Sequence, residues 1–318
     1  MRIDERKVLK LENIISEILP LTADTSQFNR VFIPIEHDFS LELANENNLN
    51  IYHLRTENRR FKYEDLTNFC VGNLSQYIFN RKTVKQAKSQ ADIQILYNRG
   101  RKQLREVRNE NDSGAGGELL LYLFLENCLH APKLLSKMEI KTTRNQYIYG
   151  ADGLHLYMTK DKYGNMLYQF VIGEAKIKND ILDATRVAFD SIRKSIDEID
   201  IETALVSEEI LKEVCTKEDA EKLIEVILPS EDIADKFTTS EKAIGLFIGY
   251  TGDYDEDIDN ASWNKKINDK IKKDIERAVD TIKKKIDGLS LKGYSFYCYY
   301  LPFNDAEKDR KTIMDNII

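Results

Sequence analysis

The sequence predicts a layered fold of the α/β or α+β class, with a mainly helical N-terminal region and a helical insert in its C-terminal part. From residue 117 onward, apolar runs of helix length and of strand length alternate along the chain. Two of the strand-length runs are separated by a short polar segment that contains Gly164-Asn165, which is typical of a hairpin turn. Helices interleaved with strands in this way favour a sheet with helices packed on it.

The elements expected in the first 110 residues are mainly helical. A helix over 5–19 ends at Pro20, a short extended stretch covers 30–35, and helices cover about 63–108. The elements expected after this region are, in order, an apolar helix from Gly117, strands over 134–143, 151–159 and 167–177, a helix over 180–196, a helical insert over about 200–240, a strand over 243–250, a helix over 263–287 and a strand over 294–303.

We therefore divide the chain into an N-terminal region, 1–110, and a larger domain, 111–318. The N-terminal region is expected to dock a partner and contact DNA, with Phe32, Ile33, Phe39 and Phe69 as anchors, although each also fits a place in the core.

The composition indicates a cytoplasmic globular protein. Of the 318 residues 42% are hydrophobic, and no apolar run approaches the 18 residues of a membrane-spanning helix. The N-terminus lacks the apolar centre of a signal peptide. The four cysteines lie far apart in the sequence, which favours reduced thiols over disulfides or a zinc site.

The net charge of −7 does not mark the protein as a polycation, but basic residues gather in two segments. Residues 81–108 hold nine Lys or Arg against two acids, and residues 265–285 hold nine against four. Each segment is either a solvated helix face or a track for a phosphate backbone. For the second interpretation the expected DNA contacts are Arg99, Arg101, Lys102, Lys272, Lys273 and Arg277.

Charged residues interrupt the apolar run FVIGEAKIK at 170–178. Glu174 and Lys176 are two residues apart, so in a strand they point to the same face. Asp152 lies between two glycines at the start of the preceding strand, and the hairpin would bring it near Glu174. One helix earlier, Glu118 stands in the first turn of an otherwise apolar helix.

These residues predict a magnesium-dependent site. Asp152 and Glu174 would ligate Mg²⁺, with Mn²⁺ as a substitute, and Glu118 would complete the shell directly or through water. Lys176 would position a water molecule or neutralise a phosphate. Structural roles compete with this interpretation, since Glu118 also complements a helix dipole, Asp152 fits a turn and the Glu-Lys pair suits an edge strand. Lys141 and His155 are weaker candidates for a phosphate contact.

The order Glu118, Asp152, Glu174-Ala175-Lys176 on helix, strand and strand resembles the D…(D/E)xK nucleases, whose restriction-endonuclease-like αβββαβ core would cover about 111–250. The wider context, GGELLLYLFLE, GADGLHL and GEAK, resembles the HamA family, the nuclease subunit of the Hachiman anti-phage defence system. This resemblance implies a metal-dependent endonuclease that hydrolyses DNA and a DExH-type helicase partner that restrains it.

Two other functions remain open on the same scaffold. The chain could be a non-catalytic module that binds nucleic acid or a partner through its basic helices, or it could be an RNase. Metal-dependent cleavage separates the nuclease from the binding module, and a comparison of DNA with RNA substrates separates the two nucleases.

Overall fold

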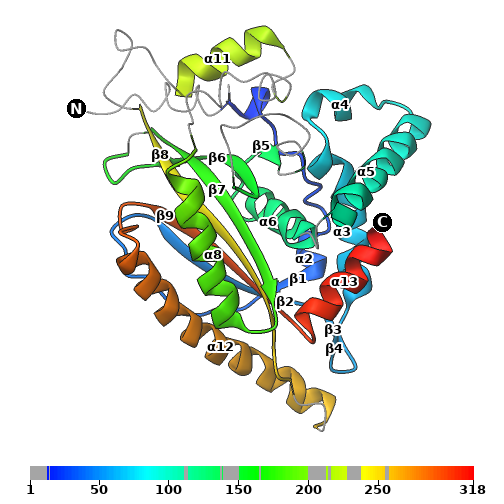
Figure 1. The fold of residues 1–318 in the computed structure, drawn as a ribbon, viewed down its shortest axis with the longest axis vertical. Coiled ribbons are helices and arrows are strands. Elements are labelled where there is room, and N and C mark those ends of the chain that lie inside the picture. Colours follow the sequence, from blue (N-terminus) through cyan, green and yellow to red (C-terminus); the bar gives the residue numbers. More distant parts are fainter. Residues whose placement is uncertain are drawn as a thin grey trace.

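A seven-stranded mixed sheet runs through the centre of the computed structural model (Figure 1). The structure describes residues 15–110, 114–136, 150–164, 166–199, 216–227, 238–254 and 258–318, together with Asn13, Met138 and Glu213. The strands of this sheet are β1 (Phe32–Pro34), β2 (Asn47–Leu54), β5 (Lys133–Ser136), β6 (Gly153–Lys160), β7 (Met166–Lys178), β8 (Thr238–Thr251) and β9 (Ser295–Phe303), and a separate small hairpin is made by β3 (Thr56–Glu57) and β4 (Arg60–Phe61).

The strand order across the sheet is β1-β2-β9-β8-β7-β6-β5. The three central strands β9, β8 and β7 run parallel to one another, and β2 is parallel to β9. The outer pairs β1–β2, β5–β6 and β6–β7 are antiparallel. Strand β9 and the run 243–250 of β8 are almost entirely apolar, because helices cover both faces of the sheet there.

Helices form a layer on each face of the sheet. They are α2 (Phe28–Val31), α3 (Tyr63–Ile78), α4 (Arg81–Gln86), α5 (Gln90–Glu110), α6 (Ala115–Asn127), α8 (Ile181–Ile196), α11 (Lys217–Ile227), α12 (Asn260–Gly288) and α13 (Ala306–Ile317). Helix α8 lies across the front of the sheet in Figure 1 with α12 beside it, and α6, α3 and α13 pack behind. Phe189 of α8 stacks on Phe296 of β9, whereas Leu121 of α6 lies against Gly173 of β7 on the opposite face.

Most of the expected elements are confirmed within the described residues. The expected hairpin is β6–β7, paired from Gly153 with Gly173 to Lys160 with Met166. Between Ala115 and Thr251 the order α6, β5, β6, β7, α8, β8 is helix, three strands, helix, strand, with α11 inserted before the last strand. Two expectations lie largely outside the described residues: the helix over 5–19, and the end of the run 134–143 beyond β5.

One strand of the sheet and one helix that packs on it were not predicted. Strand β2 and the closing helix α13 both pack on the core, where Ile51 and Ile317 are buried. Because β1 and β2 extend the sheet beside β9, the first 110 residues contribute to the same sheet as the rest of the chain. Phe32 and Phe69, named above as docking anchors, are buried in the core, while Ile33 and Phe39 are half-buried.

Local signals explain where the helices on the front face begin. The side chain of Asp180 accepts a hydrogen bond from the backbone N–H of Asp183 and caps α8, and Asp259 caps α12 in the same way through Ser262. The buried side of α12 is a helical stripe that runs from Trp263 to Ile286.

Cys70, Cys128 and Cys298 carry free thiols, as expected, and Cys215 lies outside the described residues. In the part of the chain that the structure describes, none of the helices combines the length and hydrophobicity that crossing a membrane requires.

Candidate active site at the end of the central hairpin

The hairpin register brings Asp152 beside Glu174. The last paired position is Gly153 with Gly173, and the backbone N–H of Asp152 donates to the carbonyl oxygen of Gly173 at 2.9 Å. The carboxylate of Asp152 also accepts a hydrogen bond from the backbone N–H of Ala175, with 2.8 Å between N and Oδ2. The Asp152 carboxylate is thus fixed against the strand segment that carries Glu174.

Glu174 and Lys176 form an ion pair on the face of β7 that α8 covers. Lys176 Nζ donates to Glu174 Oε1. The alternation of the strand turns Gly173 and Ala175 toward α6, so Glu174 and Lys176 point the other way. The Glu174 side chain is only 3% exposed, whereas that of Lys176 is 25% exposed, so the lysine is the part of the pair that meets solvent.

Two glycines allow the backbone to reach this geometry. Gly150 has φ +92°, and a Cβ there would lie 2.7 Å from Ser195 Oγ at the end of α8. A Cβ on Gly173 would lie 2.8 Å from Leu121 Cδ2, so the glycine lets α6 approach β7 closely. The absence of a side chain at Gly150 and at Gly173 therefore allows α8 and α6 to pack closely on the backbone on either side of the Asp152–Glu174 pair.

Glu118 reaches this end of the sheet from the other face. It lies in the first turn of α6, is 3% exposed, and accepts a hydrogen bond from the Tyr77 hydroxyl at 3.2 Å. The neighbouring Gly117 packs against Ala175 and Ile177, which places the first turn of α6 over the strand segment that carries the ion pair. Tyr77 was not among the predicted site residues, because nothing in an apolar helix distinguishes a core tyrosine from one that binds a carboxylate.

The donor set suits a magnesium ion held by two carboxylates. Asp152 and Glu174 supply hard oxygen ligands side by side, and Mg²⁺ commonly uses one or two carboxylates and completes its octahedron with water and phosphate oxygens. Within the described residues no three His, Cys, Asp or Glu side chains gather as a single metal group, so Glu118 does not share one ion position with the pair. The fit therefore rests on Asp152 and Glu174, and Glu118 would contact such an ion only through water.

His155 lies deep in the fold instead of on a phosphate-binding surface. It is 2% exposed and its Nδ1–H donates to the carbonyl oxygen of Ala131 at 2.8 Å. Burial lowers the pKa of His155 to about 3, so the ring is neutral at physiological pH. Lys141, the other weaker candidate, lies outside the described residues.

The residues predicted to contact DNA are placed differently from one another. Arg99, Lys102, Lys273 and Arg277 are exposed, and Lys272 is half-buried on α12. Arg101 is also half-buried, and its guanidinium donates to the Ile318 oxygen, as does that of Arg105. Arg101 therefore has a structural contact in addition to any role at a phosphate.

A second group of buried charges escaped the sequence analysis. Arg81 pairs with Glu213 and lies 3.9 Å from Glu126, and Lys133 Nζ lies 3.7 Å from Glu213 Oε1. All four side chains are at most 3% exposed. Arg81 stands in a segment so rich in basic residues that its sequence gives no signal of burial. We call Arg81, Glu126, Lys133 and Glu213 the interior charge cluster.

Comparison with known families gives a match over most of the chain. The model of the HamA family matches residues 28–317, which spans the sheet, both helix layers and every described residue of the candidate site. Searches among curated proteins and among solved structures each found no match.

Proposed function

Because the chain belongs to the HamA family, which supports a role in anti-phage defence, we propose that it is a magnesium-dependent DNA nuclease that works with a helicase subunit. The observation that carries the nuclease proposal is the placement of Asp152, Glu174 and Lys176 at the end of the β6–β7 hairpin. Two adjacent carboxylates can hold a metal ion, and one partly exposed lysine can offset charge on a phosphate, which suits hydrolysis of a phosphodiester.

The residues divide the work by their chemistry. Asp152 and Glu174 would hold Mg²⁺, or Mn²⁺ in its place, and the bound ion would polarise the phosphate and favour a hydroxide nucleophile. Lys176, whose ammonium group meets solvent, would orient the attacking water and offset charge on the phosphate. Glu118, held by Tyr77, would hydrogen-bond a water at the same edge.

The order of the elements supports the proposed superfamily. Helix α6, strands β5, β6 and β7, helix α8 and strand β8 follow one another as αβββαβ, the order expected of a restriction-endonuclease-like core. In that arrangement the acidic residues of the second and third strands meet where the hairpin ends, as Asp152 and Glu174 do here.

A plasmid and linear DNA cleavage assay in Mg²⁺ or EDTA tests the proposal, with RNA of the same sequence as a parallel substrate. Glu174→Gln is expected to lower the cleavage rate by more than about 100-fold, because it removes one of two metal ligands. Asp152→Asn should in addition weaken Mg²⁺ binding measured by calorimetry. Cleavage at the wild-type rate in both variants would exclude this site, and wild-type protein that binds DNA without cutting it would favour the binding module. Preference for RNA would favour the RNase.

The helicase partner is proposed from the family and needs its own test. Co-expression with the proposed helicase subunit, followed by size-exclusion chromatography, should give one complex. That complex is expected to leave intact supercoiled plasmid uncut and to cut once ATP and DNA ends or single strands are supplied. Separate elution, or degradation of intact plasmid without ATP, would contradict the proposed restraint.

The exposed cations of α12 give a DNA-binding test that does not depend on cleavage. Reversal of Lys273 and Arg277 to Glu should weaken binding of all DNA sequences alike and reduce the salt dependence of the affinity, because phosphate contacts release counterions. An affinity that is unchanged between about 50 and 200 mM salt would argue against these contacts.

A further inference from the structure

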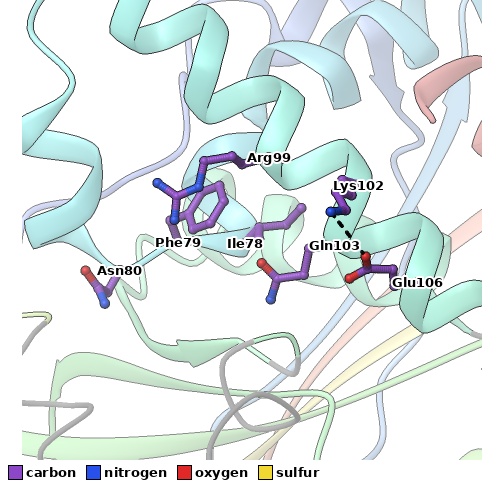
Figure 2. A pocket seen from close by; sticks show the side chains of 7 residues that line it. All are labelled: Ile78, Phe79, Asn80, Arg99, Lys102, Gln103 and Glu106. Carbon is purple, nitrogen blue, oxygen red and sulfur yellow. Dashed lines mark ion pairs between the residues drawn. The ribbon is translucent and has the colours of Figure 1, made fainter.

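A cleft of about 530 Å³ lies between the end of α3 and the outer face of α5. Figure 2 shows the side chains that line it: Ile78, Phe79, Asn80, Arg99, Lys102, Gln103 and Glu106. It differs from the hairpin site in chemistry, since cations, amides and an aromatic ring line it in place of paired carboxylates.

Arg99 is held in place but keeps its hydrogen-bond donors for other partners. Its guanidinium lies over the Phe79 ring, with 5.4 Å between Cζ and the ring centroid (Figure 2). No carboxylate in the described part of the chain pairs with Arg99. An exposed cation held on an aromatic ring in the wall of a cleft is a surface on which a nucleobase can stack.

The side-chain amides of Asn80 and Gln103 also have hydrogen-bonding groups without a partner among the described residues. Asn80 Oδ1 accepts from the backbone N–H of Thr83 and caps α4, which leaves the NH₂ group of Asn80 to other acceptors. Gln103 is half-buried, and its amide has no hydrogen bond within the described residues. These groups can bond the edge of an unpaired base, whereas in a duplex that edge is occupied by the opposite base.

Three exposed lysines follow Asn80, a residue of the cleft wall, within the next eight residues of the chain, and we call them the lysine rim. Lys82, Lys85 and Lys88 are exposed on and after α4, and none of them has an ion pair among the described residues. In the cleft wall Glu106 opposes this charge, at 3.9 Å from Lys102, and Asp92 is exposed in the first turn of α5. Such a rim attracts the phosphates on either side of a bound nucleotide.

The cleft is also tied to the candidate active site through α3. Tyr77, which donates to Glu118, directly precedes Ile78 and Phe79 of the cleft wall. The ammonium group of Lys133 donates to the carbonyl oxygens of Gln76 and Phe79 at 3.0 Å each and so fixes this end of the helix. A strand seated in the cleft therefore lies beside the helix turn that positions Glu118.

We infer that the cleft between α3 and α5 binds one unpaired nucleotide of single-stranded DNA, with its base stacked on Arg99 and its phosphates on the lysine rim. This inference rests on the proposed nuclease function for its choice of DNA, and it specifies the substrate as a single strand or a frayed end. An intact duplex would contact only the lysine rim and would place no base in the cleft.

Binding measured in EDTA separates this inference from the chemistry of cleavage. The probe is 5′-fluorescein-labelled (dT)₁₂, compared with a labelled 12-base-pair duplex, and fluorescence polarisation gives the Kd of the full chain at about 50 mM salt. Arg99→Gln is expected to weaken binding of (dT)₁₂ by about tenfold and binding of the duplex by less than about twofold, since it removes a stacking surface. Glu106→Gln should tighten (dT)₁₂ binding, because it releases Lys102.

The matched control is Lys162→Gln. Lys162 is also an exposed cation over an aromatic ring, 5.1 Å from the Tyr163 centroid, but it lies on the β6–β7 turn away from the cleft. Lys162→Gln should leave the ratio of the Kd for (dT)₁₂ to the Kd for the duplex unchanged. Equal losses for single strand and duplex in Arg99→Gln, the same selective loss in Lys162→Gln, or wild-type protein that does not prefer (dT)₁₂ would each overturn the inference. If Glu174→Gln still cuts DNA while Arg99→Gln selectively loses (dT)₁₂ binding, the proposed hairpin site is wrong and the inference about the cleft stands.

Discussion

The interior charge cluster and the hairpin site both hold charged side chains in the interior, yet they differ in balance. The cluster has two cations and two anions, and its groups are also bonded to the backbone. Arg81 donates to the carbonyl oxygens of Pro20 and Lys133, and Glu126 accepts from the backbone N–H groups of Thr22, Ala23 and Lys133. The hairpin site has two carboxylates and one lysine, and that lysine is a quarter exposed.

This difference separates charges that stabilise the fold from charges that can attract a ligand. The balanced group makes most of its hydrogen bonds within the chain, and it holds α4, α6 and β5 together. An unbalanced group with a net negative charge attracts a cation and keeps one side chain in contact with solvent. Burial alone does not separate the two, since Glu126 and Glu174 are both nearly inaccessible.

The largest effect on stability is expected when the balanced cluster is broken. Arg81→Met should lower the free energy of unfolding by about 3–5 kcal/mol, because it leaves Glu126 and Glu213 buried without their cation. Urea unfolding followed by circular dichroism measures this loss. The control is Lys82→Met at the next position, which is exposed and should change stability by less than about 0.5 kcal/mol. Equal stability of the two variants would show that the cluster does not stabilise the fold.

A smaller change in stability, but a large change in activity, is expected at the hairpin site. Lys176→Met should lower the cleavage rate by about 100-fold and the free energy of unfolding by less than about 1 kcal/mol, because the lysine is partly exposed. Lys178→Met is the matched control, since Lys178 lies two residues along the same face of β7 and pairs with Asp183. The two variants should match in thermal unfolding and differ in cleavage. Similar activity in both would remove Lys176 from the site.

A third effect depends on pH and concerns the buried ring of His155. The pKa of His155 is lowered to about 3, so the folded protein excludes a proton that the unfolded chain binds below pH 6.5. The stability that neutral His155 provides is complete above pH 6.5 and is lost as the pH falls toward 3. Between pH 7 and pH 5 the loss should be about 2 kcal/mol.

His155→Gln tests the source of that loss, because glutamine keeps a donor for the Ala131 carbonyl and has no proton to gain. Urea unfolding at pH 7 and pH 5 should show a smaller decline in the variant than in the wild type. An identical decline would assign the acid sensitivity to other groups.

The role of a residue can be predicted from the sequence when the local pattern of apolar and charged residues shows where its side chain lies. Glu174 and Lys176 stood out because charges interrupt a buried strand, and the Gly164-Asn165 turn fixed the partner that brings Asp152 near. The helix–strand order of 115–251 followed from apolar periodicity in the same way.

The rest depends on long-range contacts that no local pattern encodes. Strand β2 pairs with β9, and its sequence, NNLNIYHL, is polar enough at its start to be read as a loop. Arg81 is buried only because Glu213 and Lys133 arrive from distant parts of the chain. Tyr77 meets Glu118 because α3 packs on α6, which neither helix sequence specifies.

The parallel pairing of β2 with β9 has a consequence for how the protein is made. During translation β2 leaves the ribosome about 240 residues before β9, so β2 cannot pair with β9 until synthesis is nearly complete. Until Ser295–Phe303 emerges, β8 also presents an open edge that other nascent chains can pair with. Translation that stops before β9 is therefore expected to yield a chain that is prone to aggregation and proteolysis.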